Sequence, residues 1–117
     1  MTQIAEAHGV KSEVTYTRSY PPTVNTSAET QLIHRVASEV IGEENLLSNL
    51  EPSAGADDFA FFLLEKPGAY LWLGAGRSDE DNPALHTARY DFNDEIISNG
   101  IEILARTALA ALDADIY

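Results

Sequence analysis

The 117-residue chain contains no cysteine. This excludes disulfides, thiolate metal sites and a cysteine nucleophile, and it leaves the redox compartment open. Basic residues are also scarce: seven Lys and Arg stand against nineteen Asp and Glu, for a net charge of −12. A surface this acidic repels the phosphate backbone of nucleic acids and anionic membranes. We therefore expect neither nucleic acid nor a membrane surface as a partner.

Long hydrophobic runs are missing as well. No segment reaches the roughly eighteen apolar residues that a membrane-spanning helix needs. The N-terminus lacks the basic start and apolar stretch of a secretory signal, so we expect the chain to be cytoplasmic. Its length suits one domain, or a piece of one, with a core of its own.

The N-terminal part of the sequence predicts a small separate module. Residues 1–9 read as the last turns of a helix that ends at Gly9, and residues 12–19 alternate as a half-exposed strand does. Pro21 and Pro22 cannot donate backbone hydrogen bonds and stop any ladder there. We place a boundary at this point, which divides the chain into residues 1–19 and 20–117.

Two amphipathic helices are predicted in the second part. Thr26 and Glu29 have the spacing of a capping box, and the apolar positions that follow recur at helical spacing until Gly42. The second helix runs from Asp94 to about residue 114, with Asn93 or Asp94 as its cap. Its apolar stripe consists of Ile97, Ile101, Leu104, Ala108 and Leu112.

The region between these helices predicts short elements. Leu46 and Leu47 are compatible with a brief strand, and a turn at residues 53–58 leads into a short helix that Pro67 and Gly68 close. Residues 69–74 are continuously apolar, which is typical of a central strand covered on both faces. Helices alternating with such a strand indicate part of a layered α/β domain. The aromatic residues expected in its core are Phe59, Phe61, Phe62 and Trp72.

His86 is the candidate functional residue. It lies near the end of a long acidic loop, just before the last helix, where a rigid scaffold can present one side chain in a cleft. From the pattern alone, a lone loop histidine is more often a surface or capping residue than a metal ligand. His8 and His34 are expected to be solvated, and residues 79–81 to form a charged loop tip.

Four ordered motifs resemble the C-terminal part of the metal-dependent amidohydrolases that include hippurate hydrolase, N-acyl-amino-acid aminoacylase and auxin-conjugate hydrolase. These enzymes belong to the zinc aminopeptidase and aminoacylase superfamily. The similarity covers nearly the whole chain. The motifs that carry it are Tyr20 to Asn25, Gly55 to Phe61, Pro67 to Gly76, and Leu85-His86 with Tyr90 to Asp94.

The resemblance implies an architecture in two parts. Residues 20–117 would form the C-terminal portion of a layered αβα zinc-peptidase-like catalytic domain, and residues 1–19 the last helix and strand of a lid domain. It also implies a dinuclear Zn or Mn site to which His86 contributes one ligand. The other ligands and the general base would lie in an upstream part of the catalytic domain, so no catalytic residue is assigned to this chain.

The resemblance also implies a chemistry: a metal-activated water attacks the amide bond of an N-acyl amino acid or peptide. The turn formed by Gly55, Ala56, Asp57 and Asp58 would approach the carboxylate of the substrate. From the pattern alone, the two aspartates can equally be ordinary first-turn acids of a helix. We expect the chain to be inactive by itself and to form homo-oligomers. The alternative function is a non-catalytic α/β domain that self-associates through an uncovered apolar face.

Overall fold

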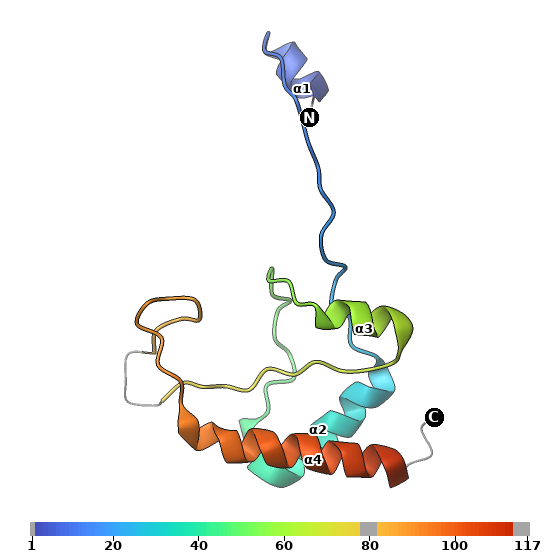
Figure 1. The fold of residues 1–117 in the computed structure, drawn as a ribbon, viewed down its shortest axis with the longest axis vertical. Helices are drawn as coiled ribbons and strands as arrows, with labels where there is room; N and C mark the ends of the chain where they lie inside the picture. The colour runs from blue at the N-terminus through green and yellow to red at the C-terminus, as the bar shows by residue number, and fades with distance from the viewer. Residues whose placement is uncertain (1, 78–81, 114–117) are drawn as a thin grey trace.

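The computed structural model describes residues 2–77 and 82–113, and the regular elements of this part are all helical (Figure 1). The charged tip expected at residues 79–81 lies outside the described residues. In chain order the elements are α1 (Thr2–Ala7), α2 (Ser27–Ile41), the 3₁₀ turn η1 (Glu43–Asn45), α3 (Phe59–Glu65), the 3₁₀ turn η2 (Asp94–Ile96) and α4 (Ile97–Asp113).

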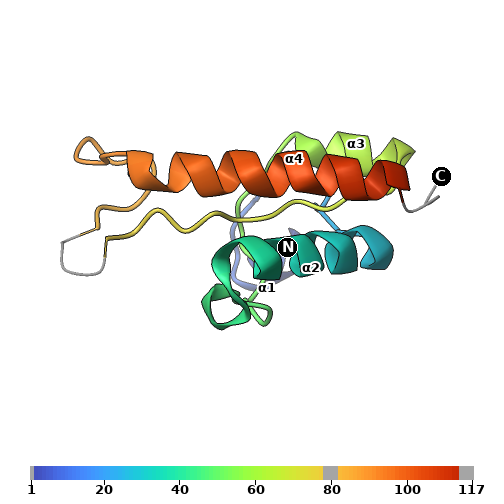
Figure 2. The ribbon, with the colours of Figure 1, turned by 90° about the horizontal axis from the view of Figure 1, so that it is seen from below.

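The small core lies between α2 and α4, which lie side by side (Figure 2). Helix α2 buries Leu32, Val36 and Ala37, which share one face at the predicted spacing. Helix α4 contributes Ile103, which is 2% exposed. The chain leaves α2 through Gly42, whose φ of 86° is readily adopted only by glycine. The prediction of both long helices is therefore confirmed.

The predicted strands are wrong for this structure. Residues 12–19, 46–47 and 69–74 all lie within the described part of the chain, and none of them is paired in a sheet. A strand exists through hydrogen bonds to a neighbour, and none of these segments meets another extended segment in register. The apolar pattern of residues 69–74 is real, but the partner that would make it a strand is absent from the described residues.

Residues 69–76 nevertheless run as an open segment, which Figure 2 shows at a level between α4 and α2 (Figures 1 and 2). Leu71, Leu73 and Ala75 are half-buried and alternate with exposed Trp72 and Gly74, as the two faces of a strand do. Leu73 packs on α4 at Gly100, where its Cδ2 lies 3.0 Å from the position that a Cβ would occupy. The segment therefore has one face on α4 and one in solvent.

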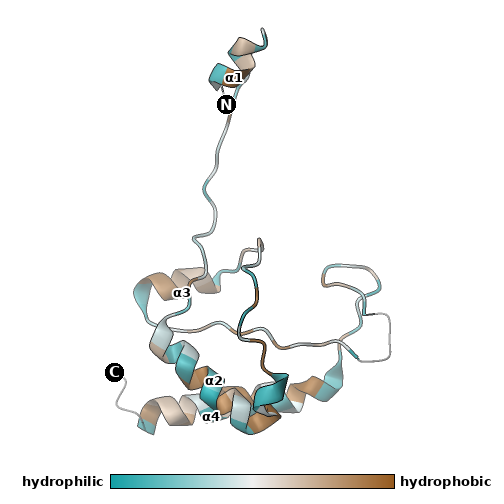
Figure 3. Cartoon of the chain, turned by 180° about the vertical axis from the view of Figure 1, so that it is seen from behind, coloured by the Kyte–Doolittle hydropathy of each residue, from teal (hydrophilic) through white to brown (hydrophobic). Residues whose placement is uncertain are grey.

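The side of α4 that packs on α2 is not the predicted stripe. Ile103 and Gly100 face inward, whereas the large members of the stripe are 44–79% exposed: Ile97, Ile101, Leu104 and Leu112. Figure 3 shows hydrophobic residues at several places along this helix. Helix α4 is thus apolar on more of its circumference than this fold buries.

The aromatic side chains depart from the prediction in the same way. Phe61, Phe62 and Trp72 were expected in the core, and they are 48%, 68% and 62% exposed. They belong to a surface cluster in which Phe59 stacks on Phe62 and tilts against Tyr70. In the described part of the chain, the rings of Phe61, Phe62 and Trp72 thus lie at the surface and not in the core.

The N-terminal segment stands away from the rest. Helix α1 ends before Gly9, whose φ is 71°, and residues 8–19 are exposed along their whole length (Figure 1). The radius of gyration is 19.9 Å, whereas a compact chain of this length has one of roughly 13 Å. No helix in the described part of the chain has the length and hydrophobicity to cross a membrane.

Candidate functional site

His86 lies in an exposed turn that precedes α4. Its φ is 66°, which makes it the non-glycine residue with positive φ in the described part of the chain. A side chain with a Cβ adopts this left-handed region at a cost, and histidine is one of the few residues enriched there. Backbone strain at a single loop position is a common feature of functional sites. His86 itself is exposed to solvent.

The described residues do not form a complete metal site around His86. No group of three or more His, Asp or Glu side chains gathers within residues 2–77 and 82–113. A catalytic Zn²⁺ usually takes three protein ligands, and one exposed imidazole does not hold it. The described residues by themselves therefore do not hold a resident metal ion.

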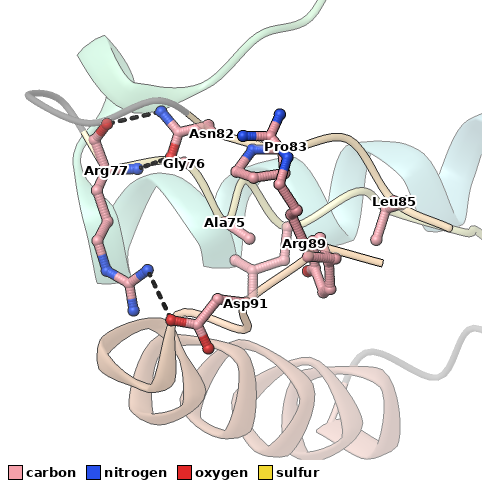
Figure 4. A pocket seen from close by; sticks show the side chains of 10 residues that line it. Ala75, Gly76, Arg77, Asn82, Pro83, Leu85, Arg89 and Asp91 are labelled. Atoms are coloured by element: carbon pink, nitrogen blue, oxygen red, sulfur yellow. Dashed lines mark hydrogen bonds and ion pairs between the residues drawn. The ribbon is translucent and has the colours of Figure 1, made fainter. Parts of the chain in front are cut away.

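A pocket of about 320 Å³ lies beside this turn, between residues 73–77 and 82–91 (Figure 4). Leu85, the neighbour of His86, lines it. Arg77 Nη1 lies 3.8 Å from Asp91 Oδ2, and its Nη2 donates to the Phe92 carbonyl at 3.3 Å. Figure 4 shows the Arg89 side chain extending toward Pro83 instead, so the two guanidinium groups do not converge on one point.

The turn at residues 53–58 is held by its own side chains. Ser53 Oγ accepts from the Gly55 N–H at 3.0 Å, and Asp57 Oδ1 accepts from the Phe59 N–H at 2.8 Å. The second bond satisfies a donor at the start of α3. Asp57 Oδ2 accepts from the Tyr70 hydroxyl at 3.0 Å. Both oxygens of Asp57 thus have partners within the chain, whereas Asp58 and Gly55 are exposed.

The bond to Asp57 also changes the acidity of Tyr70. The hydrogen bond to the carboxylate raises the pKa of the Tyr70 phenol above its usual value of 10.0, and partial burial and the negative charges of Asp57 and Asp58 raise it further. A phenol that donates to a carboxylate resists losing its proton, because the phenolate would face two negative charges. Tyr70 is therefore a fixed donor to the turn at neutral pH.

Asn25 in turn fixes Tyr70. Its Oδ1 accepts from the Tyr70 N–H at 2.8 Å, and its Nδ2 donates to the Tyr70 carbonyl at 2.8 Å. One amide side chain thus takes the place of a neighbouring strand for one residue. Sequence reasoning missed both Asn25 and Tyr70 as parts of this site. The available signal was that each belongs to one of the four motifs, at a separation of 45 residues.

The structure does not bring the two predicted site regions together. His86 and the turn at residues 55–58 belong to separate segments, and no contact joins them among the described interactions. His34, expected to be solvated, lies 3.0 Å from Ser48 Oγ and 3.7 Å from Glu43 Oε1 through its Nε2. His8 is exposed.

Comparisons with known proteins place this sequence in a family. The model of peptidase family M20/M25/M40 matches residues 4–110. "Probable hydrolase sll0100" of Synechocystis is 34% identical over 92% of this chain and 28% of its own length. IAA-amino acid hydrolase ILR1-like 4 of Arabidopsis thaliana is 30% identical over 76% of this chain and 20% of its own. Thermostable carboxypeptidase 1 of Saccharolobus solfataricus is 27% identical over 94% of this chain and 27% of its own length.

The chain thus spans under a third of the length of the curated relatives that it matches. No solved structure gives a significant match. The family implies an α/β zinc-peptidase fold and enzymes that are generally dependent on divalent metal, and the relatives are named as a hydrolase, an IAA-amino acid hydrolase and a carboxypeptidase. The match over residues 4–110 covers most of the sequence, including all four motifs. The chain belongs to peptidase family M20/M25/M40.

Proposed function

We propose that this chain is the C-terminal segment of a metal-dependent amidohydrolase that acts on N-acyl amino acids. The observation that carries the proposal is His86, an imidazole presented on a strained, exposed turn inside a sequence that matches a hydrolase family. When bound, the two Zn or Mn ions would supply an activated water and a charge that stabilises the tetrahedral intermediate. His86 would donate one ligand nitrogen to one of them.

The turn at residues 55–58 would face the substrate. Asp57 is tied to Tyr70 and to the start of α3, so its charge is directed inward, and exposed Gly55 leaves the backbone approachable. A small residue at this position lets a ligand come close to backbone N–H groups. This supports a role for Gly55 and Ala56 near the substrate carboxylate, with Asp57 and Asp58 shaping the turn.

The same proposal makes the chain inactive by itself, since the remaining ligands and the general base would come from an upstream part of the catalytic domain. Residues 1–19 would then be the end of the lid domain and residues 20–117 the end of the catalytic domain. The exposed position of residues 8–19 supports this division. The compartment we expect for the protein is the cytoplasm.

A hybrid enzyme tests the proposal. This chain replaces the matching segment of the Synechocystis hydrolase, and release of amino acid from N-acetyl amino acids is measured with added Mn²⁺ or Zn²⁺. We expect the chain alone to be inactive and the hybrid to be active. His86→Ala should lower the activity of the hybrid at least about 100-fold, because losing a ligand exceeds the effect of losing its supporting residues. His34→Ala is the matched control and should retain activity.

Two outcomes would contradict the proposal. Full activity of the His86→Ala hybrid would remove His86 from the metal site. Hydrolysis by the unaltered chain alone, lost in His86→Ala, would show that 117 residues suffice and that the upstream part is not required.

A further inference from the structure

Tyr70 lies at the centre of a chain of hydrogen bonds to which the proposed function gives no role. Its N–H donates to Asn25 Oδ1 and its carbonyl accepts from Asn25 Nδ2, both at 2.8 Å. Its hydroxyl donates to Asp57 Oδ2 at 3.0 Å, and Asp57 Oδ1 accepts from the Phe59 N–H at 2.8 Å. Tyr70 thus joins the segment before α2 to the turn at residues 53–58.

The position of Tyr70 is fixed from both sides. Next to Asn25, the Thr26 N–H donates to the Gly68 carbonyl and Thr26 Oγ1 accepts from the Gly68 N–H, each at 2.9 Å. The backbone around Tyr70 is therefore attached to the start of α2, the helix with most of the buried core residues in the described part. The ring tilts against Phe59, with the two centroids 5.5 Å apart. The hydroxyl thus reaches the turn from a rigid frame.

This hydroxyl decides where the negative charge of Asp57 lies. Asp57 is half-buried, whereas Gly55, Ala56 and Asp58 are exposed. The hydrogen bond to Asp57 raises the pKa of the Tyr70 phenol, so the hydroxyl remains a donor at neutral pH. Without this donor, one carboxylate oxygen loses its partner, and a charged group without a partner turns toward water.

A carboxylate released at this place would oppose the binding of an anion. Asp57 directly follows the exposed backbone of Gly55 and Ala56, which we propose faces the substrate carboxylate. Asp58 already places one exposed negative charge beside this backbone. A second exposed carboxylate would add to the repulsion of an anionic substrate. The hydrogen bond from Tyr70 thus keeps this part of the turn less negative.

We propose that Tyr70 is a positioning residue for the binding of the substrate carboxylate. It acts through Asp57, whose charge it holds away from the exposed backbone of Gly55 and Ala56, and Asn25 holds Tyr70 in place. This inference rests on the proposed function, which places the carboxylate of the substrate at this turn. It assigns Tyr70 and Asn25 to substrate affinity and leaves the chemical step to the metal site.

Steady-state kinetics of the hybrid enzyme test this role. Tyr70→Phe keeps the ring and removes the hydroxyl. We expect its KM for N-acetyl amino acids to rise about tenfold, the order of one lost hydrogen bond, with kcat within about twofold. Tyr20→Phe is the matched control, because the Tyr20 hydroxyl makes no hydrogen bond within residues 2–77 and 82–113. It should leave both constants unchanged.

A second substitution separates this role from a merely structural one. Asp57→Asn in the Tyr70→Phe background removes the released charge but does not restore the lost hydrogen bond. We expect it to bring KM back to within about threefold of that of the unaltered hybrid, since a neutral amide does not repel the substrate. An unchanged KM in Tyr70→Phe, a fall in kcat as large as the rise in KM, or a double variant no better than Tyr70→Phe would overturn the inference.

Hydrogen exchange on the chain by itself gives a reading that needs no activity. The Phe59 amide should exchange severalfold faster in Tyr70→Phe, because the released carboxylate no longer accepts from it, and Tyr20→Phe should not change its rate. An unchanged rate in Tyr70→Phe would overturn the inference. An inactive unaltered hybrid would overturn the proposed function, and the binding role of Tyr70 with it. An active hybrid in which Tyr70→Phe keeps the normal KM would overturn this inference alone.

Discussion

At the scale of single residues, His86 is the proposed metal ligand and also has a backbone conformation that is unfavourable for a residue with a Cβ. Its φ of 66° lies where a Cβ approaches the following carbonyl oxygen. Glycine has no such contact. We expect His86→Gly to be more stable than His86→Ala by about 1 kcal/mol, since alanine retains the strain and glycine removes it. Urea unfolding of the two variants measures this difference.

The comparison is informative because both substitutions remove the imidazole. If the two variants unfold at the same urea concentration, the turn is not strained and the backbone gives no argument for function at His86. If His86→Gly is the more stable, the chain retains a strained histidine where glycine is better tolerated, as sites under functional constraint do.

Tyr70 offers a second residue-scale prediction, through its pKa. The hydrogen bond to Asp57 raises the pKa of the phenol, so Asp57→Asn should lower that pKa back toward 10.0. Absorbance at 295 nm between pH 8 and 12 follows phenolate formation. Tyr70→Phe identifies which of the five tyrosines has changed. An unchanged titration in Asp57→Asn would show that the two side chains do not interact in solution.

The same shift predicts a pH dependence of stability. The pKa of Tyr70 is raised in the folded state above its unfolded value, so the unfolded state loses the proton first. The stabilisation is therefore fully present below pH 10 and is lost as the pH rises through the folded pKa. Above pH 10, the free energy of unfolding of the unaltered chain should fall relative to that of Tyr70→Phe. Between pH 7 and 9, the free energies of unfolding of the two proteins should change with pH in the same way.

At the scale of elements, the start of α2 is joined to the end of α3. The Thr26 N–H donates to the Gly68 carbonyl, and Thr26 Oγ1 accepts from the Gly68 N–H, each at 2.9 Å. The predicted capping box does not form: the Thr26 hydroxyl donates to the Glu29 carboxylate and accepts from the Gly68 N–H, and neither side chain bonds a backbone N–H at the start of α2. The residue that precedes α2 is thus held by a tertiary contact with a residue 42 positions away.

This contact predicts a difference between two substitutions. Thr26→Val keeps the shape and removes the hydroxyl, which leaves the Gly68 N–H without its acceptor and should lower the free energy of unfolding by about 1–2 kcal/mol. Thr26→Ser keeps the hydroxyl and should stay within about 0.5 kcal/mol of the unaltered chain. Thermal unfolding followed by circular dichroism compares them, and equal midpoints would show that the bond to Gly68 contributes nothing.

The elements also show which parts of the structure can be predicted from sequence. Helices α2 and α4 are encoded locally, because the apolar residues of one helical face repeat within a few positions. The segment at residues 69–74 has the apolar pattern of a strand, but a strand forms only when it is hydrogen-bonded to another strand. The local sequence does not tell which segment, if any, is that partner. The hydrogen bonds of Asn25 and Asp57 to Tyr70 could not be predicted from the sequence either. Each polar residue has several possible partners, and only the fold selects one.

At the scale of the whole molecule, the structure separates an exposed N-terminal segment from a helical body. Residues 8–19 are all exposed, and α1 does not pack on another element. The first contact that joins this end to the body is Tyr20, whose ring lies 5.6 Å from that of Phe61. Folding stability should therefore reside in residues 20–113.

Deleting residues 1–19 tests this division. Exposed residues that make no contacts contribute little to the free energy of unfolding, so the shortened chain should unfold within about 0.5 kcal/mol of the unaltered one. The deletion combined with Tyr20→Ala should destabilise further, because it removes the aromatic contact with Phe61. Urea unfolding at one fixed chain concentration keeps association from distorting the comparison. A large loss on deleting residues 1–19 alone would mean that the segment packs on the body in solution, and that the boundary before Tyr20 does not divide two independent modules.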